Sequence, residues 1–308
     1  MITIYFRTVK KRKLQILPAP RVGAWVHAQN PTGSEITRLC NDLGVNENIV
    51  RDALDPHEVP RVEVENGVTY VFTRVPQTHD DIDMSTVPVL IALGETFILT
   101  VAPQHVVFLD RFTSASVDFY TTQKVKLFIQ FFAAITAVYN RRLTLIAKRV
   151  RAMNATDINS ARDVANFVET ERILNDYLSA LSPTGRVLRR LLTGNVRRFT
   201  FHERDEDLVE DLLIDTEQLE GMCHATLKHS VSIRTAHATI ATHNLNTTIK
   251  TLTALTIILT IPTIIASFFG MNVPIPLAQY QGGFSVIVGI TGIIVILVMW
   301  LFYRKRWF

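Results

Sequence analysis

Two apolar segments near the C-terminal end dominate the hydropathy pattern of this chain. The first, residues 249–269, has no charged residue after Lys250 and is long enough to cross the hydrocarbon core of a bilayer, about 30 Å, as a helix. The second, residues 284–303, is apolar over nearly its whole length. A connector with two prolines and no charge, residues 273–283, separates them. The pattern predicts two transmembrane helices.

A polar stripe runs along the first of these helices. Its members are spaced alternately by three and four positions: Asn246, Ile249, Thr253, Thr256, Thr260, Thr263, Ser267 and Gly270. This spacing keeps them on one helical face. Small hydroxyl residues also occur where membrane helices pack closely, but a stripe of this length that ends close to an asparagine favours a water-lined pore.

The first 123 residues show the shorter-period pattern of an α/β domain. Strands are predicted at residues 1–6, 22–27, 61–65, 68–74, 87–93 and 96–101. Asn66-Gly67 joins two of them and is a favoured pair for a two-residue hairpin turn. Short helices are predicted at residues 45–54 and from Gln104 onward, where they would cover the sheet.

Long helices are predicted between this domain and the membrane. Apolar residues at helical spacing fill residues 125–153 and 157–181. The segment Ser182-Pro183-Thr184 is typical of a new helix start.

A last helix is predicted to run from Glu203 to Gly270, because no strong breaker precedes Pro262 and glycine commonly ends a helix. At 1.5 Å per residue it would be about 100 Å long, and such a helix is stable only when it packs on neighbours. We therefore expect an α/β domain at 1–123, a helical region and stalk at 124–245, and a membrane region at 246–308.

Charge and cysteine content exclude several classes of protein. The formal net charge is +4, the sequence pI is about 9.1 and the mean hydropathy is +0.20. The basic residues form no single stripe with interleaved aromatic residues, so we expect no nucleic-acid partner. Cys40 and Cys223 are isolated in the sequence, so neither a disulfide framework nor a zinc ribbon is indicated.

Basic residues mark the same side of both predicted spans. Lys250 begins the first span and Arg304-Lys305-Arg306 follows the second, which places both ends in the cytoplasm by the positive-inside rule. No secretory signal pattern opens the chain, so we expect a multi-pass protein of the cell (plasma or inner) membrane with a cytoplasmic N-terminal part. Two spans cannot enclose a pore, so several copies must assemble in the bilayer.

Three segments together resemble the CorA family of magnesium, cobalt and nickel transporters. Gly270-Met271-Asn272 stands at the outer end of the first of two C-terminal spans, where this family has its signature. Residues 52–63 are similar to the helix-then-strand passage of the family's N-terminal domain, and the basic end with Trp307 is similar to its terminus. The resemblance implies a funnel-shaped homopentamer that takes up Mg²⁺ down its electrochemical gradient.

Within the family, the pore residues follow from the position of the signature. Gly270, Met271 and Asn272 would form the selectivity filter, with five Asn272 carboxamides as neutral oxygen ligands for a hydrated ion. The pore would be lined by Asn246, Ile249, Leu252, Thr253, Thr256, Thr260, Thr263 and Ser267. Ile249 and Leu252 would form an apolar constriction that closes by dewetting.

The resemblance also implies regulation by intracellular Mg²⁺. Asp52 and Asp211 match family aspartates that bind Mg²⁺ between neighbouring subunits and hold the closed state. Two features depart from the family pattern: Arg51 replaces an acidic residue, and the connector 273–283 has no acidic residue near the pore mouth. Mg²⁺ would thus be both transported and regulatory, and no organic cofactor is expected.

Two other functions remain open at this stage. A zinc, cobalt or nickel transporter could use the same scaffold, and a membrane-anchored sensor could use the two spans without a pore. The histidines of the stalk invite a zinc site, but their spacing does not place two ligands on one helix face: His224, His229, His237 and His243. An enzyme is not expected, because no phosphate-binding loop, nucleophile elbow or catalytic metal cluster is recognisable.

Overall fold

The fold is described from a computed structural model that covers residues 1–77, 85–153, 161–194, 200–272, 282–305 and 307. The chain divides into two compact units, Met1–Ser232 and Ile233–Phe308. Each unit has its own architecture.

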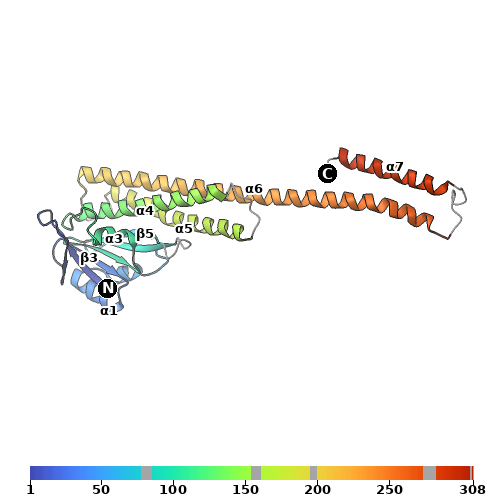
Figure 1. Cartoon of the computed structure of the whole chain (residues 1–308). Helices are drawn as coiled ribbons and strands as arrows, with labels where there is room; N and C mark the ends of the chain where they lie inside the picture. Colours follow the sequence, from blue (N-terminus) through green and yellow to red (C-terminus); the bar gives the residue numbers. More distant parts are fainter. Residues whose placement is uncertain (78–84, 154–160, 195–199, 273–281, 306, 308) are drawn as a thin grey trace. The chain divides into compact units, whose positions relative to one another are not determined.

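Within its described residues, the first unit contains a seven-stranded sheet of order β2-β1-β3-β7-β6-β5-β4 (Figure 1). The strands are β1 (Ile2–Phe6), β2 (Gln15–Leu17), β3 (Ala24–Gln29), β4 (Val62–Glu65), β5 (Val68–Pro76), β6 (Thr86–Leu93) and β7 (Phe97–Ala102). Neighbouring strands are antiparallel except β3 and β7, which are parallel. Every residue of β6 and β7 is buried, as expected for central strands that are covered on both faces.

The predicted strands and their hairpins are confirmed, with small shifts in their ends. Asn66 and Gly67 have φ angles of 49° and 79°, as a turn with positive φ at both central positions requires. The expected strand at 22–27 begins two residues later, at Ala24. The short edge strand β2 was not predicted, because three residues provide too little alternation to recognise.

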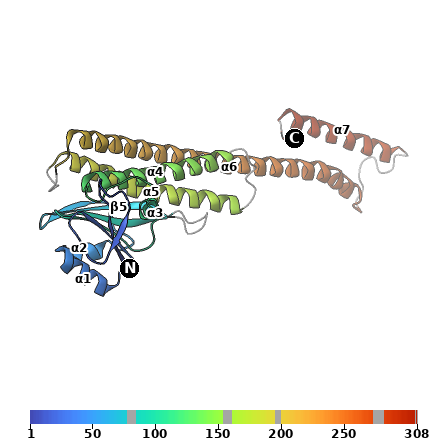
Figure 2. The same ribbon diagram turned by 60° about the vertical axis from the view of Figure 1, so that its left-hand side comes forward.

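Helices cover the two faces of this sheet (Figure 2). On one face lie α1 (Gly33–Leu43) and α2 (Glu47–Asp52), which pack on a core that includes Val26, Tyr70 and Leu90. Thr32 and Glu35 form a capping box at the start of α1. On the other face lie α3 (Val107–Thr113) and a bundle of long helices, of which α4 (Lys124–Met153) and α5 (Ala161–Leu192) contact β5.

The long helices are α4 (Lys124–Met153), α5 (Ala161–Leu192) and α6 (Glu203–Phe269). The predicted new helix start at Pro183 is wrong, since α5 continues through this proline. A proline inside a helix costs about 3 kcal/mol, but Leu181 and Val187 on either side of it are buried. Burial of these side chains explains why the helix persists. The start of the predicted helix 157–181 falls partly outside the described residues.

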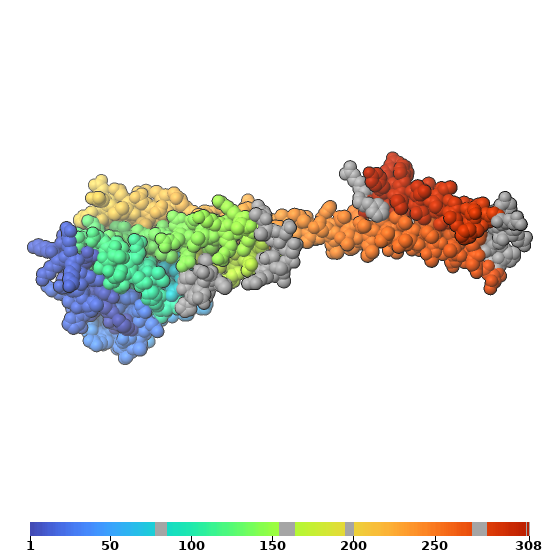
Figure 3. Space-filling view, in the orientation of Figure 1, coloured from blue at the N-terminus to red at the C-terminus, as the bar shows by residue number. Residues whose placement is uncertain are grey.

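The second unit is a helical hairpin. It contains the C-terminal part of α6 and α7 (Gly283–Arg304), and both helices are long and apolar enough to cross a membrane. Gly270 ends α6, and its N–H donates to the carbonyl of Ala266 at 3.0 Å. α7 returns beside α6 (Figure 3). The Thr251 hydroxyl donates to the Thr247 carbonyl at 3.0 Å and also lies 3.4 Å from the Trp307 carbonyl. The predicted spans are therefore confirmed as an antiparallel pair of helices.

Candidate functional site

The predicted pore face lies on α6 and is uncovered in the single chain. Its side chains are all exposed: Asn246, Ile249, Leu252, Thr253, Thr256, Thr260, Thr263 and Ser267. Ile249 is 52% exposed and Leu252 is 64% exposed. α7 thus leaves this face of α6 open, as it also leaves apolar neighbours such as Leu259, which is 63% exposed.

The threonine hydroxyls on this face are fixed by the helix itself. Each donates its proton to the carbonyl four residues earlier: Thr253 to Ile249 at 2.8 Å, Thr256 to Leu252 at 2.9 Å, Thr260 to Thr256 at 2.7 Å and Thr263 to Leu259 at 3.1 Å. A hydroxyl that has donated its proton still offers oxygen lone pairs. The face therefore presents hydrogen-bond acceptors, which suit the water molecules around a hydrated cation.

The signature Gly270-Met271-Asn272 directly follows the last turn of α6. Met271 is 52% exposed and Asn272 is also exposed. The C-terminal end of a helix has a partial negative charge, so this position favours a cation. Of the connector without acidic residues, 273–283, positions 273–281 lie outside the described residues.

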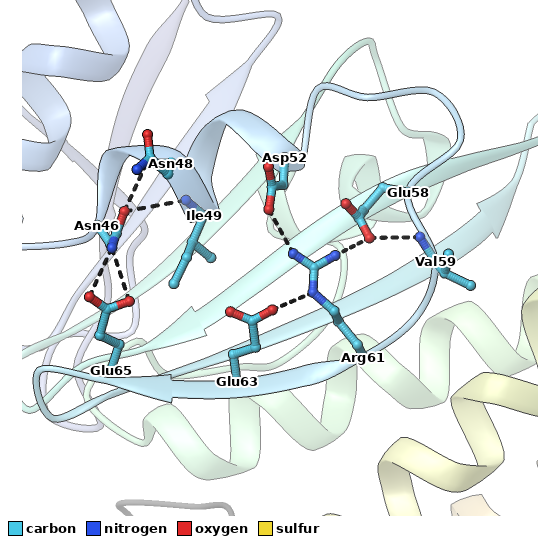
Figure 4. A network of polar contacts seen from close by, with 9 residues as sticks. All are labelled: Asn46, Asn48, Ile49, Asp52, Glu58, Val59, Arg61, Glu63 and Glu65. Atoms are coloured by element: carbon cyan, nitrogen blue, oxygen red, sulfur yellow. Dashed lines mark hydrogen bonds and ion pairs between the residues drawn. The ribbon is translucent and has the colours of Figure 1, made fainter.

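Asp52 lies at the end of α2 and forms an ion pair with Arg61 of the same chain (Figure 4). Its carboxylate accepts from the Arg61 guanidinium at 2.7 Å. The same guanidinium donates to Glu63 at 2.5 Å and also pairs with Glu58. It lies 4.0 Å from the ring centre of Phe72. Arg61 therefore holds three carboxylates in one cluster.

The charge of Arg61 is strongly favoured in this cluster. Partial burial lowers its pKa, but hydrogen bonds to Glu58 and Glu63 outweigh burial, and the net effect is to raise the pKa of the guanidinium. The backbone of the segment that bears Glu58 is also fixed, because the Arg74 guanidinium donates to the carbonyls of Pro56 at 2.9 Å and Glu58 at 2.7 Å. The arrangement of the cluster is thus fixed by both side-chain and backbone contacts.

The position of α2 depends on Asn46, which caps its first turn (Figure 4). The Asn46 Oδ1 atom accepts from the backbone N–H groups of Asn48 at 2.8 Å and Ile49 at 3.5 Å. Its Nδ2 atom donates to both carboxylate oxygens of Glu65, at 2.8 and 2.9 Å. Asn46 therefore joins the helix that bears Asp52 to strand β4.

The other predicted regulatory residues are arranged differently. Asp211 is exposed on α6, and within one chain no hydrogen bond or ion pair joins it to Asp52. Arg51, the departure noted in the sequence, turns to Glu47 at 2.5 Å on its own helix. The interaction of Arg61 with Asp52 was missed by sequence reasoning, although the pattern of Glu58, Arg61 and Glu63 was a visible signal.

Among the residues that the structure describes, no group of three or more His, Cys, Asp and Glu side chains is arranged to hold a metal ion. Cys40 and Cys223 are free and buried. Burial raises the pKa of the Cys40 thiol to about 11 and that of Cys223 to about 12.

These features define a membrane protein with an α/β domain, a long helix and an apolar hairpin whose first helix exposes a polar face. Residues 22–305 match the family described as "CorA-like Mg2+ transporter protein". The chain belongs to this family and is a divalent cation transporter of the CorA type. This membership confirms the family resemblance and the fold class expected from the sequence.

Individual relatives agree with this assignment. The chain is 22% identical to the "Cobalt/magnesium transport protein CorA" of Methanocaldococcus jannaschii over 294 residues, which are 92% of this chain and 90% of that protein. The complete structure of the CorA magnesium transporter from the same organism matches with a TM-score of 0.86 at 20% identity, covering 100% of this chain and 99% of that one. The full-length CmaX protein matches with a TM-score of 0.76 at 15% identity, covering 99% and 97%. At these identities the structural matches show a shared fold.

Proposed function

We propose that several copies of this chain form a channel for Mg²⁺ uptake, with α6 lining the pore. The observation that carries this proposal is the polar face of α6, which is exposed in the otherwise apolar segment 251–269 and ends at Gly270-Met271-Asn272. Five copies, as the family resemblance implies, would turn these faces toward a common axis. A sensor whose helices only anchor it in the membrane would not require a polar face on one of them.

Asn272 supplies the filter in this proposal. Mg²⁺ gives up its water molecules reluctantly, so a ring of neutral carboxamide oxygens that accepts a hydrated ion is a suitable filter. Transport needs no ATP, because a membrane potential of 100 mV contributes about 4.6 kcal/mol for a divalent ion. Ile249 and Leu252 form the constriction that closes the pathway.

Both termini lie in the cytoplasm in this proposal, and the membrane is the plasma or inner membrane. The contact between Thr251 and Trp307 supports the placement of both ends on one side of the membrane, since it brings Trp307 beside the start of the first span. Lys250 and Arg304 lie at these two ends, as the positive-inside rule requires.

Cytosolic Mg²⁺ closes the channel through Asp52 of one copy and Asp211 of the next. Carboxylate oxygens are the ligands that Mg²⁺ prefers, and both side chains are exposed, so the residues suit this ion. A bound ion would offset the repulsion between two carboxylates, and its loss would loosen the contact between copies.

Cobalt is the second candidate substrate, because the relative from Methanocaldococcus jannaschii is named a cobalt/magnesium transport protein. Zinc and nickel remain alternatives on the same scaffold. The filter proposed here has oxygen ligands only, which suit Mg²⁺ better than ions that prefer nitrogen or sulfur.

Ion uptake into proteoliposomes tests the proposal. Liposomes loaded with a Mg²⁺ indicator and held at an inside-negative potential should take up Mg²⁺ through the wild type, and Asn272→Ala should abolish or clearly change the flux. Thr291→Ala is the control, since it removes a hydroxyl from the other membrane helix. Uptake of Zn²⁺ or Co²⁺ without Mg²⁺ would show a different substrate, and no flux of any ion with oligomeric protein would refute the pore.

A further inference from the structure

The cation that pairs with Asp52 is shared among three carboxylates. Arg61 contacts Asp52, Glu58 and Glu63 at the same time (Figure 4). Three negative charges and one positive charge leave the cluster with two negative charges that this guanidinium does not compensate. The cluster therefore still attracts cations, but the guanidinium of Arg61 already occupies the position between the three carboxylates.

The three carboxylates differ in how easily solvent reaches them. The side chain of Asp52 is 48% exposed, that of Glu63 is 40% exposed and that of Glu58 is 13% exposed. Arg61 is 29% exposed, and its stacking on Phe72 holds it in place independently of Asp52. Asp52 is thus the most exposed of the three partners and belongs to the proposed regulatory pair, so an ion from solution can take it over while Arg61 keeps its contacts with Glu58 and Phe72.

We propose that Arg61 is a built-in cation that competes with Mg²⁺ for Asp52, and so raises the cytosolic Mg²⁺ concentration at which the channel closes. This inference rests on the proposed closure through Asp52 and Asp211. An ion that binds Asp52 must weaken the charge-assisted hydrogen bond to Arg61 and tolerate a fixed positive charge nearby. Both effects oppose binding, and both disappear when the guanidinium is removed.

Arg51 provides a matched control for the charge of Arg61. It is the sequence neighbour of Asp52, yet its guanidinium pairs with Glu47 and not with Asp52. Arg51→Gln and Arg61→Gln each remove one positive charge from the same region. Only Arg61→Gln also frees the Asp52 carboxylate, so the difference between the two variants isolates the competition.

The test measures how much Mg²⁺ protects the full-length protein from limited proteolysis, which does not depend on transport. We expect Arg61→Gln to lower the Mg²⁺ concentration for half-maximal protection about tenfold, equivalent to about 1.4 kcal/mol. Arg51→Gln should shift it less than twofold. Arg61→Lys keeps the positive charge without the forked geometry of the guanidinium. Its half-maximal Mg²⁺ concentration should lie between those of the wild type and Arg61→Gln. In the double variant Asp52→Asn, Arg61→Gln, the half-maximal Mg²⁺ concentration should no longer be lowered.

Two outcomes would overturn the proposal: an unchanged or higher half-maximal concentration in Arg61→Gln, or the same shift in Arg51→Gln. If Arg61→Gln does not fold, an Arg61→Lys value equal to that of the wild type overturns it as well. Flux at low internal Mg²⁺ is measured in parallel in the wild type. A wild type that is protected by Mg²⁺ but carries no ions would contradict the proposed function alone, so the two failures are distinguishable.

Discussion

Replacement of Asn46 should weaken the first unit by an amount that the structure allows us to work out. Asn46→Ala removes the cap of α2, which is worth about 1 kcal/mol. It also removes the two hydrogen bonds to the Glu65 carboxylate. Hydrogen bonds to charged groups are worth about 1.5–3 kcal/mol when buried, and because this pair is partly exposed we take about 1 kcal/mol. The expected loss is therefore about 2 kcal/mol.

Thermal unfolding of the detergent-solubilised protein gives the measurement. For a unit of this size, about 2 kcal/mol lowers the Tm by about 4–8 °C. Asn48→Ala is the control, because Asn48 is exposed on the same helix and contributes only its backbone N–H to the cap. Exposed substitutions of this kind usually stay within about 0.5 kcal/mol.

Two further variants separate the two roles of Asn46. Asn46→Ser keeps a capping oxygen and loses the contact with Glu65, so about half of the loss in Tm should remain. Asn46→Asp keeps the cap but places a carboxylate against the Glu65 carboxylate, so its Tm should fall below that of Asn46→Ser. Equal Tm values for Asn46→Ala and Asn48→Ala would refute this account of how α2 is held.

Three other predictions concern the pore face and the cysteines. Thr256→Val keeps the shape of the side chain but removes one hydrogen-bond acceptor per copy. Mg²⁺ flux should fall at least about fivefold, because one lost hydrogen bond is worth about 1 kcal/mol. Thr291→Val, on the other membrane helix, should leave the flux unchanged. Ile249→Asn should keep the constriction wet, and flux at high internal Mg²⁺ should then rise several-fold above the wild type; an unchanged closed state would place the constriction elsewhere. Because their raised pKa values leave very little thiolate at pH 8, Cys40 and Cys223 should react with iodoacetamide at least 100-fold more slowly in the native protein than after unfolding, and fast native labelling would contradict their burial.

Local sequence signals predicted much of the fold. The turn at Asn66-Gly67 and the helix end at Gly270 were recognisable because each depends on the conformation of one or two residues. The extent of α6 was recognisable because strong breakers are scarce in it. Pro183 misled the prediction, because a helix start and a helix interior differ there only in what the neighbouring side chains bury. Burial between distant elements is not visible in a local pattern.

The polar face of α6 was predictable from the sequence, whereas the contacts of Asp52 in the α/β domain were not. The stripe on α6 follows from periodicity alone, and the structure places its members on one exposed face. The partner of Asp52 was not predictable, because Arg61 reaches it only after α2 folds back over the start of β4. Sequence reasoning examined Arg51, the neighbour along the chain, whereas the relevant arginine is the neighbour in space.

The bonding of the stripe threonines has a consequence for protons. A chain of hydroxyl groups relays protons only if each group can release its own proton to the next. In α6 these protons are committed to backbone carbonyls, as in Thr256, whose hydroxyl donates to Leu252 at 2.9 Å. The stripe also contains no side chain that titrates near neutral pH. These four threonine hydroxyls of the proposed pore wall therefore do not themselves form a relay for protons, and any proton movement along the pore would depend on its water.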